Sequence, residues 1–264
     1  MPLPPLALRS DALRGRVALV TGVSRRIGIG FAIARRLAEC GADLFIQSLV
    51  SYDAEQPWGA DANAIETVLA DLRAIGGRVE HVSADFRDPT APAAVTQNAV
   101  SAFGHVDILI ANHAYSTPGD LAAMTAEQID THLAVNVRGT LLLAQAFDRQ
   151  HDGRRGGRVI LMTSGQHGGP MSGEMAYVAS KAALHGLTLS LSAHFIRRGI
   201  TVNTVNPGAT DTGYAPPDFY EAVRAASPQG RWGEPDDAAR LIAWLAADDA
   251  AWVTGQVINS TGGS

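Results

Sequence analysis

A tyrosine and a lysine four residues apart, Tyr177 and Lys181, are the residues whose types and spacing most directly suggest chemistry. On a helix this spacing places both side chains on one face, one turn apart. A phenol titrates near pH 10 in water, but a cation about 4 Å away can lower its pKa by about three units at an effective dielectric constant of about 20. The chain has 20 arginines and this single lysine. The pair therefore predicts a proton donor for a bound carbonyl, with an exposed surface pair as the alternative.

A glycine-rich turn, Thr21–Gly30, follows the first apolar run and precedes a helical stretch rich in alanine and arginine. Glycines allow the backbone to turn tightly and to approach a pyrophosphate, which binds at the helix amide groups. The turn predicts a dinucleotide site, and a turn that serves only packing is the alternative.

The elements that must position these residues follow an alternating pattern of short apolar runs and longer stretches with helical periodicity. This pattern is typical of repeated βαβ units. We expect an α/β, Rossmann-type, doubly wound fold with a seven-stranded, mostly parallel sheet and helices on both faces. The expected strands are Val17–Thr21, Leu44–Ser48, Arg78–Ala84, Val106–Ala111, Val159–Thr163, Thr201–Asn206 and Gln256–Asn259.

A length of 264 residues fits one domain of this kind. We expect an N-terminal arm over residues 1–13 and a dinucleotide-binding catalytic domain over 14–264. Residues 209–235 are rich in proline and glycine and are long for a connection, so they are expected to form a lid, with a solvated loop as the alternative.

Composition excludes several classes of function. A net charge of −5 argues against nucleic-acid or basic membrane contacts, and no apolar run is long enough to span a membrane. The only cysteine, Cys40, cannot form an internal disulfide, so a cytoplasmic location is expected. The eight histidines show no compact ligand spacing, and no metal is expected.

With these motifs, residues 14–263 resemble the short-chain dehydrogenase/reductase family of the classical type, and in particular its 3-oxoacyl-carrier-protein reductases. The family usually shows T-G-x-x-x-G-x-G, whereas here Gly22 and Gly28 are six residues apart, so the turn is two residues longer. Ser164 stands 13 residues before Tyr177, as the catalytic serine of the family does.

The resemblance implies a hydride transfer between a nicotinamide cofactor and a ketone or secondary alcohol. Tyr177 would exchange the proton, Ser164 would hold the carbonyl oxygen, and Lys181 would lower the pKa of Tyr177 and bind the ribose. Asn136 would hold a water in a proton relay.

The second strand ends without the acidic side chain that an NAD-preferring member offers to the ribose, and arginines lie in the glycine turn. NADP(H) is therefore the expected cofactor, with NAD(H) as the alternative. Asp85 is one of the expected cofactor contacts, with a helix-capping or turn residue as the alternative. The expected cofactor contacts are Gly22, Ser24, Arg25, Arg26, Ile27, Gly28, Ile29, Ser48, Asp85, Phe86, Asn112, Tyr177, Lys181, Pro207, Gly208, Thr210 and Thr212.

The resemblance implies a small carbonyl or alcohol substrate, including a 3-oxoacyl thioester. An enoyl reductase is a rival because of the lengthened turn, and a catalytically silent NADP(H)-binding sensor is another. The family usually forms dimers or tetramers, and Met175, Val178, Leu184 and Leu189 are candidate interface contacts. The segments expected to line the substrate site, each also compatible with ordinary loop surface or packing, hold His113, Tyr115, Gln166, His167, Met171 and Tyr214.

Overall fold

The seven predicted apolar runs form one parallel β-sheet in the computed structural model, which describes residues 8–60 and 63–263. The strand order is β3-β2-β1-β4-β5-β6-β7, and every pairing is parallel. The expected seven-stranded, doubly wound sheet is confirmed, and each strand boundary lies within two residues of its prediction. The strands are β1 (Val17–Thr21), β2 (Asp43–Ser48), β3 (Val79–Ser83), β4 (Ile108–Ala111), β5 (Arg158–Met162), β6 (Thr201–Asn206) and β7 (Val257–Asn259).

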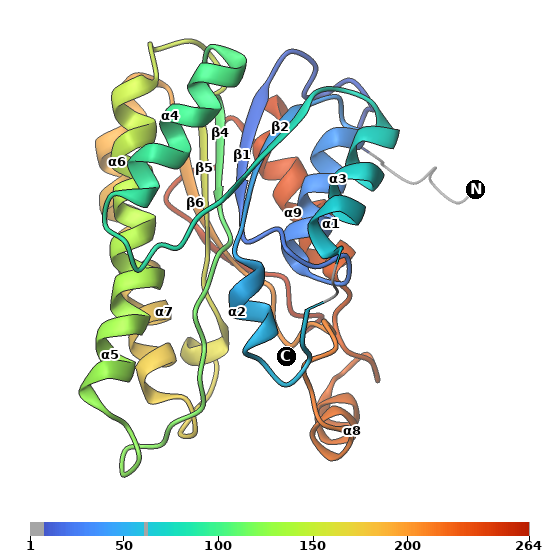
Figure 1. The fold of residues 1–264 in the computed structure, drawn as a ribbon, viewed down its shortest axis with the longest axis vertical. Coiled ribbons are helices and arrows are strands. Elements are labelled where there is room, and N and C mark those ends of the chain that lie inside the picture. The colour runs from blue at the N-terminus through green and yellow to red at the C-terminus, as the bar shows by residue number, and fades with distance from the viewer. Residues whose placement is uncertain (1–7, 61–62, 264) are drawn as a thin grey trace.

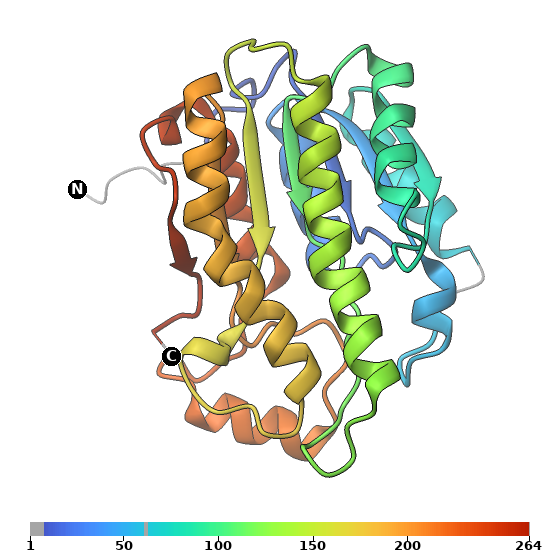
Figure 2. The same cartoon turned by 90° about the vertical axis from the view of Figure 1, so that its left-hand side faces the viewer.

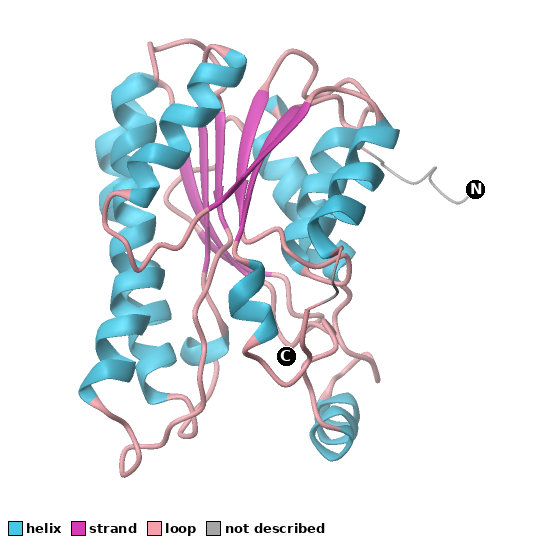
Figure 3. Cartoon of the chain, in the orientation of Figure 1, coloured by secondary structure: helices cyan, strands magenta, loops and turns pink. Residues whose placement is uncertain are grey.

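Helices cover both faces of this sheet (Figures 1 and 3). One face carries α1 (Ile29–Glu39), α3 (Ala64–Ile75) and α9 (Pro235–Ala246). The other carries α4 (Ala91–Phe103), α6 (Thr140–Gln150) and α7 (Met175–Phe195), which lie in front of the strands in Figure 2. Shorter elements are α2 (Val50–Ala54), α5 (Ala126–His132), α8 (Pro217–Ala226), the π-helix η1 (Leu133–Gly139) and the 3-10 turns η2 (Gly165–His167), η3 (Ile196–Arg198) and η4 (Asp248–Ala250).

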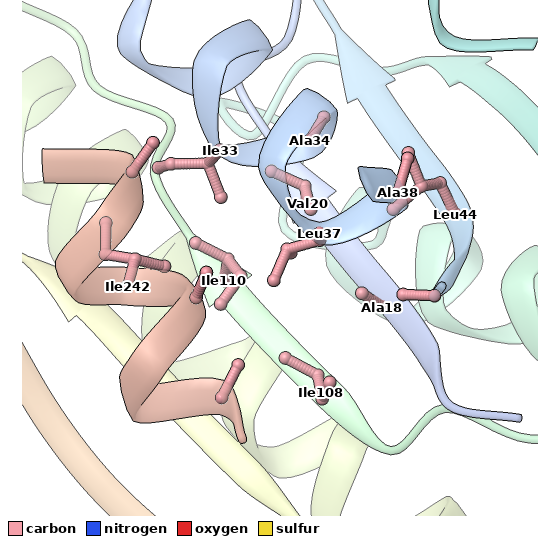
Figure 4. Packing of buried hydrophobic residues seen from close by; sticks show 14 of the residues in the cluster. Ala18, Val20, Ile33, Ala34, Leu37, Ala38, Leu44, Ile108, Ile110 and Ile242 are labelled. Carbon is pink, nitrogen blue, oxygen red and sulfur yellow. The ribbon is translucent and has the colours of Figure 1, made fainter. Parts of the chain in front are cut away.

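The core divides into two layers because successive residues of a strand point to opposite faces. In β1, Ala18 and Val20 join the layer under α1 and α9, whereas Val17 and Leu19 join the layer under α4, α6 and α7. Figure 4 shows the first layer, where side chains of α1 and α9 meet those of β1, β2 and β4. This packing fixes α1, and therefore the glycine turn that precedes it.

The carboxyl ends of all seven strands point toward the end of the molecule where α2 and α8 lie (Figure 1). The chain winds outward from β1 to β3 and then returns to place β4 on the other side of β1. Open α/β sheets bind ligands at such a reversal, because the loops after the two strands diverge there. The fold thus directs attention to the ends of β1 and β4.

Two predicted segments are more ordered than their sequence suggests. In the expected arm, Leu13 is buried, and its amide donates to the carbonyl of Cys40; residues 1–7 lie outside the described residues. The expected lid contains helix α8 and is closed at its base by a bridge between Thr210 and Gly233. Its buried Trp232 stacks on Tyr220, so this segment, the flap (residues 209–235), contains a packed aromatic contact.

The close approach of α1 to the glycine turn yields a testable prediction. A Cβ added at Gly30 would lie 2.2 Å from the carbonyl oxygen of Gly22 and 2.7 Å from Nδ2 of Asn112. We expect Gly30→Ala to lower the free energy of unfolding by about 1–3 kcal/mol, as overpacking does. The matched control is Gly186→Ala in α7, where a Cβ meets nothing within 4 Å. Chemical denaturation should show that control to be neutral or stabilised by about 0.5–1 kcal/mol; equal effects of both variants would contradict the steric argument.

Candidate functional site

A pocket opens at the carboxyl ends of β1, β2 and β4, between the glycine turn and the segments that follow β2 and β3. Its lining comes from the glycine turn and from five other parts of the chain. The lining residues are Gly22, Ser24, Arg25, Gly28, Ile29, Gly30, Gln47, Leu49, Tyr52, Asp53, Glu55, Ala84, Asp85, Phe86, Arg87, Asn112, His113, Ala114, Tyr115, Val135 and Thr212.

The glycine turn provides a backbone surface for this pocket. Gly22 has a φ of +72°, which a residue with a side chain rarely adopts. Asn112 Nδ2 donates to the carbonyls of Thr21 (3.0 Å) and Gly22 (3.2 Å) and so fastens the turn to the end of β4. Gly28 is the N-cap of α1 and Ile29 is its first residue, and the helix dipole at this end favours an anion. The amide of Gly28 itself donates to the Arg25 carbonyl (3.0 Å). The arrangement fits a dinucleotide whose pyrophosphate lies against the turn.

Two expected cofactor contacts are wrong in this geometry. Ser48 is fully buried, and its hydroxyl bonds Nε2 of His81 (2.8 Å) instead of reaching the pocket. Arg26 points away and pairs with Asp71 (2.6 Å). The alternation of side chains along β2 explains the first error, since the residue before Ser48 is the one that faces the pocket.

Gln47, the residue before Ser48, connects the glycine turn to the sheet through hydrogen bonds. Its Oε1 accepts from the amide of Gly22 (3.0 Å), and its Nε2 donates to the carbonyl of Ala84 (2.6 Å). The uncharged amide thus links the ends of β1, β2 and β3. This structural use explains why no acidic side chain occupies the end of β2.

The segment after β2 supplies residues that the sequence analysis missed. Leu49, Tyr52, Asp53 and Glu55 line the pocket from α2 and its flanks. Asp53 is buried and accepts hydrogen bonds from the Ser24 hydroxyl and from Trp58 Nε1. No sequence motif marks them, because only the fold brings α2 against the glycine turn.

Three further expected residues lie on the wall of the pocket near β3 and β4. Asp85 accepts from the amide of Arg87 (2.8 Å) and from its guanidinium, so the turn-residue alternative also holds. Phe86 packs edge to face on His113. His113 is buried, with Nδ1 bonded to the hydroxyl of Thr21 and Nε2 to the carbonyl of Val135. Burial, with the nearby Lys181, lowers the pKa of His113 to about 3, so it is a packed, neutral residue of the pocket wall.

The predicted catalytic residues meet where β5 contacts α7. Lys181 is 2% exposed, and its Nζ donates to the carbonyl of Met162 at the end of β5 (3.0 Å). One residue later, the hydroxyl of Thr163 donates to the Lys181 carbonyl (2.9 Å). These bonds hold α7 against the strand end, which brings Ser164 within hydrogen-bonding reach of the Tyr177 phenol.

The expectation that Lys181 brings the pKa of Tyr177 toward neutrality is wrong for this geometry. Lys181 Nζ lies 5.6 Å from the centroid of the phenol ring. Burial raises the pKa of Tyr177 well above its usual value, against a lowering contribution from Ser164, and the charge of Glu174 raises it further. Burial also lowers the pKa of Lys181 to about 8. Removal from water penalises both the phenolate and the ammonium, and this cost exceeds their attraction.

Asn136 lies in the π-helix η1 and is fully buried. Its Nδ2 donates to the Tyr115 carbonyl and to the Ser180 hydroxyl (both 2.9 Å), and its Oδ1 accepts from the Tyr115 amide (2.7 Å). Both amide hydrogens are therefore committed to positioning Tyr115 and Ser180. The π-helix is a local distortion of a kind that occurs often at functional sites.

A series of aromatic rings connects the pocket to the catalytic phenol. Tyr52 lies 5.7 Å from Tyr115, which lies 4.9 Å from His132, which in turn lies 6.4 Å from Tyr177, measured between ring centroids. Tyr115, an expected substrate contact, is thus between the two parts of the site.

The other expected substrate residues come from the flap and from the segment between β5 and α7. Tyr214 of the flap is exposed by 42% and is close enough to Tyr177 to raise its pKa. Met171 is half-buried, whereas His167 is exposed and bonds Asn259 Oδ1 (2.8 Å). Gln166 donates to the Thr163 hydroxyl, and its own Oε1 is buried without a partner among residues 8–60 and 63–263.

Glu174 is a site residue that the sequence analysis did not single out. It precedes α7 by one residue, and its carbonyl accepts from the Val178 amide in the first turn. Its half-buried carboxylate has no ion-pair partner in the described part of the chain, and burial raises its pKa.

The turn after β6 completes the site. Gly208 has a φ of +68°, and its amide donates to Asn206 Oδ1 (3.0 Å). Thr210 is buried and bonds the carbonyls of Pro207 and Gly208, so its hydroxyl is used within the turn. Thr212 lines the pocket, and Ile27 of the glycine turn lies close to Gly213 beside it.

Among the residues that the structure describes, no group of three His, Cys, Asp or Glu side chains is arranged to hold a metal ion. Within the same residues, no helix combines the length and apolar character needed to cross a membrane.

The chain is similar to known proteins over nearly its whole length. The family model described as "Enoyl-(Acyl carrier protein) reductase" matches residues 22–264. An uncharacterized oxidoreductase of Bacillus subtilis, YjdA, is 39% identical over 94% of this chain and 96% of its own. A Burkholderia cenocepacia short chain dehydrogenase solved in complex with NADP is 37% identical, with a TM-score of 0.86 over 96% of this chain and 99% of that one.

A blue fluorescent protein from a metagenomic library, solved in complex with NADPH, is 34% identical, with a TM-score of 0.86 over 96% of this chain and 98% of its own. The identities and the coverage, together with the parallel sheet and the pocket at its reversal point, lead to one conclusion. The chain belongs to the short-chain dehydrogenase/reductase family, and it is an oxidoreductase.

Proposed function

We propose that this protein is an NADP(H)-dependent oxidoreductase that interconverts ketones and secondary alcohols. The observation that carries the proposal is the meeting of Ser164, Tyr177 and Lys181 at the end of β5. The nicotinamide cofactor, when bound, supplies or accepts the hydride. The chain's own residues then have to orient the substrate and move one proton.

In the reduction, Tyr177 gives its hydroxyl proton to the carbonyl oxygen, which takes the π-electron pair of the C=O bond as the carbon gains its hydrogen. Ser164 donates a hydrogen bond to the same oxygen. The raised pKa of Tyr177 keeps the phenol protonated, so it can donate at neutral pH. In the oxidation the phenolate acts as the base and accepts the proton of the alcohol.

Lys181 supports the phenol and is available to the cofactor ribose, since its bond to the Met162 carbonyl uses only one of its three donors. The relay water that the resemblance implies would bind the carbonyl of Asn136, because both hydrogens of the side-chain amide are committed. That carbonyl accepts from the Thr140 hydroxyl (2.7 Å).

Arg25 supports NADP(H) as the preferred cofactor. It lines the pocket, and no carboxylate pairs with it among the described residues, whereas Arg87, which also lines the pocket, is paired with Asp85. An unpaired guanidinium suits a 2′-phosphate. Two solved relatives hold NADP or NADPH. NAD(H) remains the weaker alternative, since Asp53 and Glu55 also line the pocket.

An enoyl reductase is the second candidate. The description of the matching family model and the lengthened glycine turn favour it. Three residues separate Tyr177 from Lys181 where six would be expected for that activity. We therefore rank ketone reduction first, with a 3-oxoacyl thioester as one candidate substrate, and a silent sensor last.

We further propose a cytoplasmic homo-oligomer, a dimer or tetramer. Leu189 of α7 is 71% exposed and Leu133 of η1 is 40% exposed, and both elements flank the catalytic residues. Leu184, in contrast, is buried within the chain and is not an interface contact.

The role of Tyr177 is tested by Tyr177→Phe. Loss of the only proton donor should lower kcat for ketone reduction by about 100-fold to 10 000-fold. Affinity for NADPH, measured by fluorescence titration, should change little because the ring is retained. Turnover near the wild-type rate would refute the assignment.

The influence of Glu174 is tested by the pH profile of alcohol oxidation. Its negative charge raises the pKa of Tyr177, so Glu174→Gln should lower that pKa. The rise in kcat/KM with pH should then begin at lower pH than in the wild type, because the phenolate forms earlier. Glu80→Gln on the exposed side of β3 is the control and should leave the profile unmoved. A shift toward higher pH would contradict the prediction.

Acetoacetyl and crotonyl thioesters of the same carrier separate the two candidate activities. We expect NADPH oxidation at 340 nm with the first and none with the second. Reduction of the crotonyl thioester would establish the enoyl reductase instead. Binding of NADPH without turnover of either thioester or of any simple ketone would favour the sensor.

A further inference from the structure

Arg25, in the lengthened glycine turn, contacts two other parts of the chain and also lines the cofactor pocket. Its Nη2 donates to the carbonyl of Thr212 in the flap (2.8 Å). Its guanidinium lies over the ring of Trp58, 5.2 Å from the ring centroid, in the segment after α2. The same side chain lines the cofactor pocket.

These contacts are held in place by a buried carboxylate. Asp53 accepts from Trp58 Nε1 (3.2 Å) and from the hydroxyl of Ser24, the neighbour of Arg25. Asp53 is 5% exposed, so it cannot move toward solvent without breaking both bonds. The bond from Trp58 therefore holds the indole ring in place against the Arg25 guanidinium, and the bond from Ser24 holds the glycine turn next to Arg25.

The flap lies against the turn at a second point. A Cβ added at Gly213 would be 3.5 Å from Ile27 Cδ1 and 3.7 Å from Arg25 Nη2. The next residue of the flap, Tyr214, is close enough to Tyr177 for its charge to raise the pKa of Tyr177. A displacement of Arg25 would therefore shift the flap around Thr212 and Gly213, and with it the neighbouring Tyr214 on the substrate side of Tyr177.

Resting on the proposed function, we propose that Arg25 is a positioning residue that couples the adenosine end of the cofactor to the flap. Within residues 8–60 and 63–263, its guanidinium has the Thr212 carbonyl and the Trp58 ring as partners but no carboxylate. A 2′-phosphate would supply the missing negative charge while the bond to Thr212 is kept, since a guanidinium has five donors. By linkage, phosphate binding and flap closure then favour one another.

This coupling differs from simple recognition of a phosphate in one measurable way. A residue that only binds the 2′-phosphate affects the KM for NADPH and nothing else. A residue that also holds the flap affects the KM for the ketone, even when NADH is the cofactor, because the bond to Thr212 does not involve the phosphate.

The experiment compares the wild type with Arg25→Ala and Arg25→Lys in the full-length protein. The KM for a ketone substrate is measured at saturating NADPH and at saturating NADH. Tryptic cleavage after Arg224, an exposed residue of α8 in the flap, is followed by mass spectrometry with each cofactor. Arg240→Ala, on the exposed side of α9, is the control.

In the wild type, NADPH should slow cleavage after Arg224 more than NADH does. Arg25→Ala should raise the ketone KM by about tenfold with both cofactors, the size expected for one hydrogen bond of a charged group. It should also speed cleavage and abolish the difference between cofactors, while kcat changes less. Arg25→Lys keeps the charge but loses the planar fork, so it should restore part of the NADPH affinity and little of the protection.

Trp58→Phe and Trp58→Ala separate the contribution of the aromatic ring under Arg25 from that of the N–H group bonded to Asp53. The phenylalanine keeps an aromatic face under Arg25 and should protect the flap better than the alanine does. The Arg240→Ala variant should match the wild type throughout.

The proposal is overturned if Arg25→Ala raises only the KM for NADPH and leaves the ketone KM and the cleavage rate unchanged. The cleavage assay needs cofactor binding but no turnover, so it decides the coupling even if no ketone is reduced. Failure of NADPH to bind in calorimetry would instead refute the proposed function.

Discussion

The burial of a single ammonium group at the end of β5 is the constraint on which the site depends. Lys181 is 2% exposed and forms no ion pair among the described residues. Its ammonium group contacts the Met162 carbonyl and the adjacent phenol ring instead. Such a group is costly to remove from water, and burial lowers its pKa to about 8. The geometry tolerates this cost because α7 is fastened to the strand by the bond from Thr163. The same hydrogen bond helps to bring Ser164 and Tyr177 close together.

The surrounding polar groups are mostly committed to positioning and not to direct contact. Gln47 joins three strand ends, Asn112 holds the glycine turn, and Asn136 holds the backbone of Tyr115. Buried amides of this kind make a rigid frame because each unsatisfied donor would destabilise the fold. Three charged side chains differ from these amides: among the described residues, Lys181, Glu174 and Arg25 form no ion pair. These three side chains lie at the catalytic, substrate and cofactor parts of the site.

The predictions that succeeded were those that depend on periodicity and on chain order. Apolar runs identified all seven strands, and the glycine turn identified the pocket at the end of β1. The errors concerned the direction of individual side chains. Ser48 and Arg26 were expected at the pocket from their nearness in sequence, but each points elsewhere to a partner, His81 or Asp71. The expected lowering of the Tyr177 pKa failed because burial, which a sequence does not display, opposes the attraction to Lys181.

The sequence by itself determined the class of fold, the family and the identity of the candidate proton donor, because these follow from residue types at fixed spacing along a helix or strand. Only the tertiary structure decided which acidic and basic groups remain unpaired and which segments share the pocket. Asp53, Trp58 and Thr212 are separated from Arg25 by 28 to 187 residues, yet all contact it or its neighbour Ser24. These long-range contacts depend on how the sheet and its crossover connections pack, so they cannot be predicted from the local sequence.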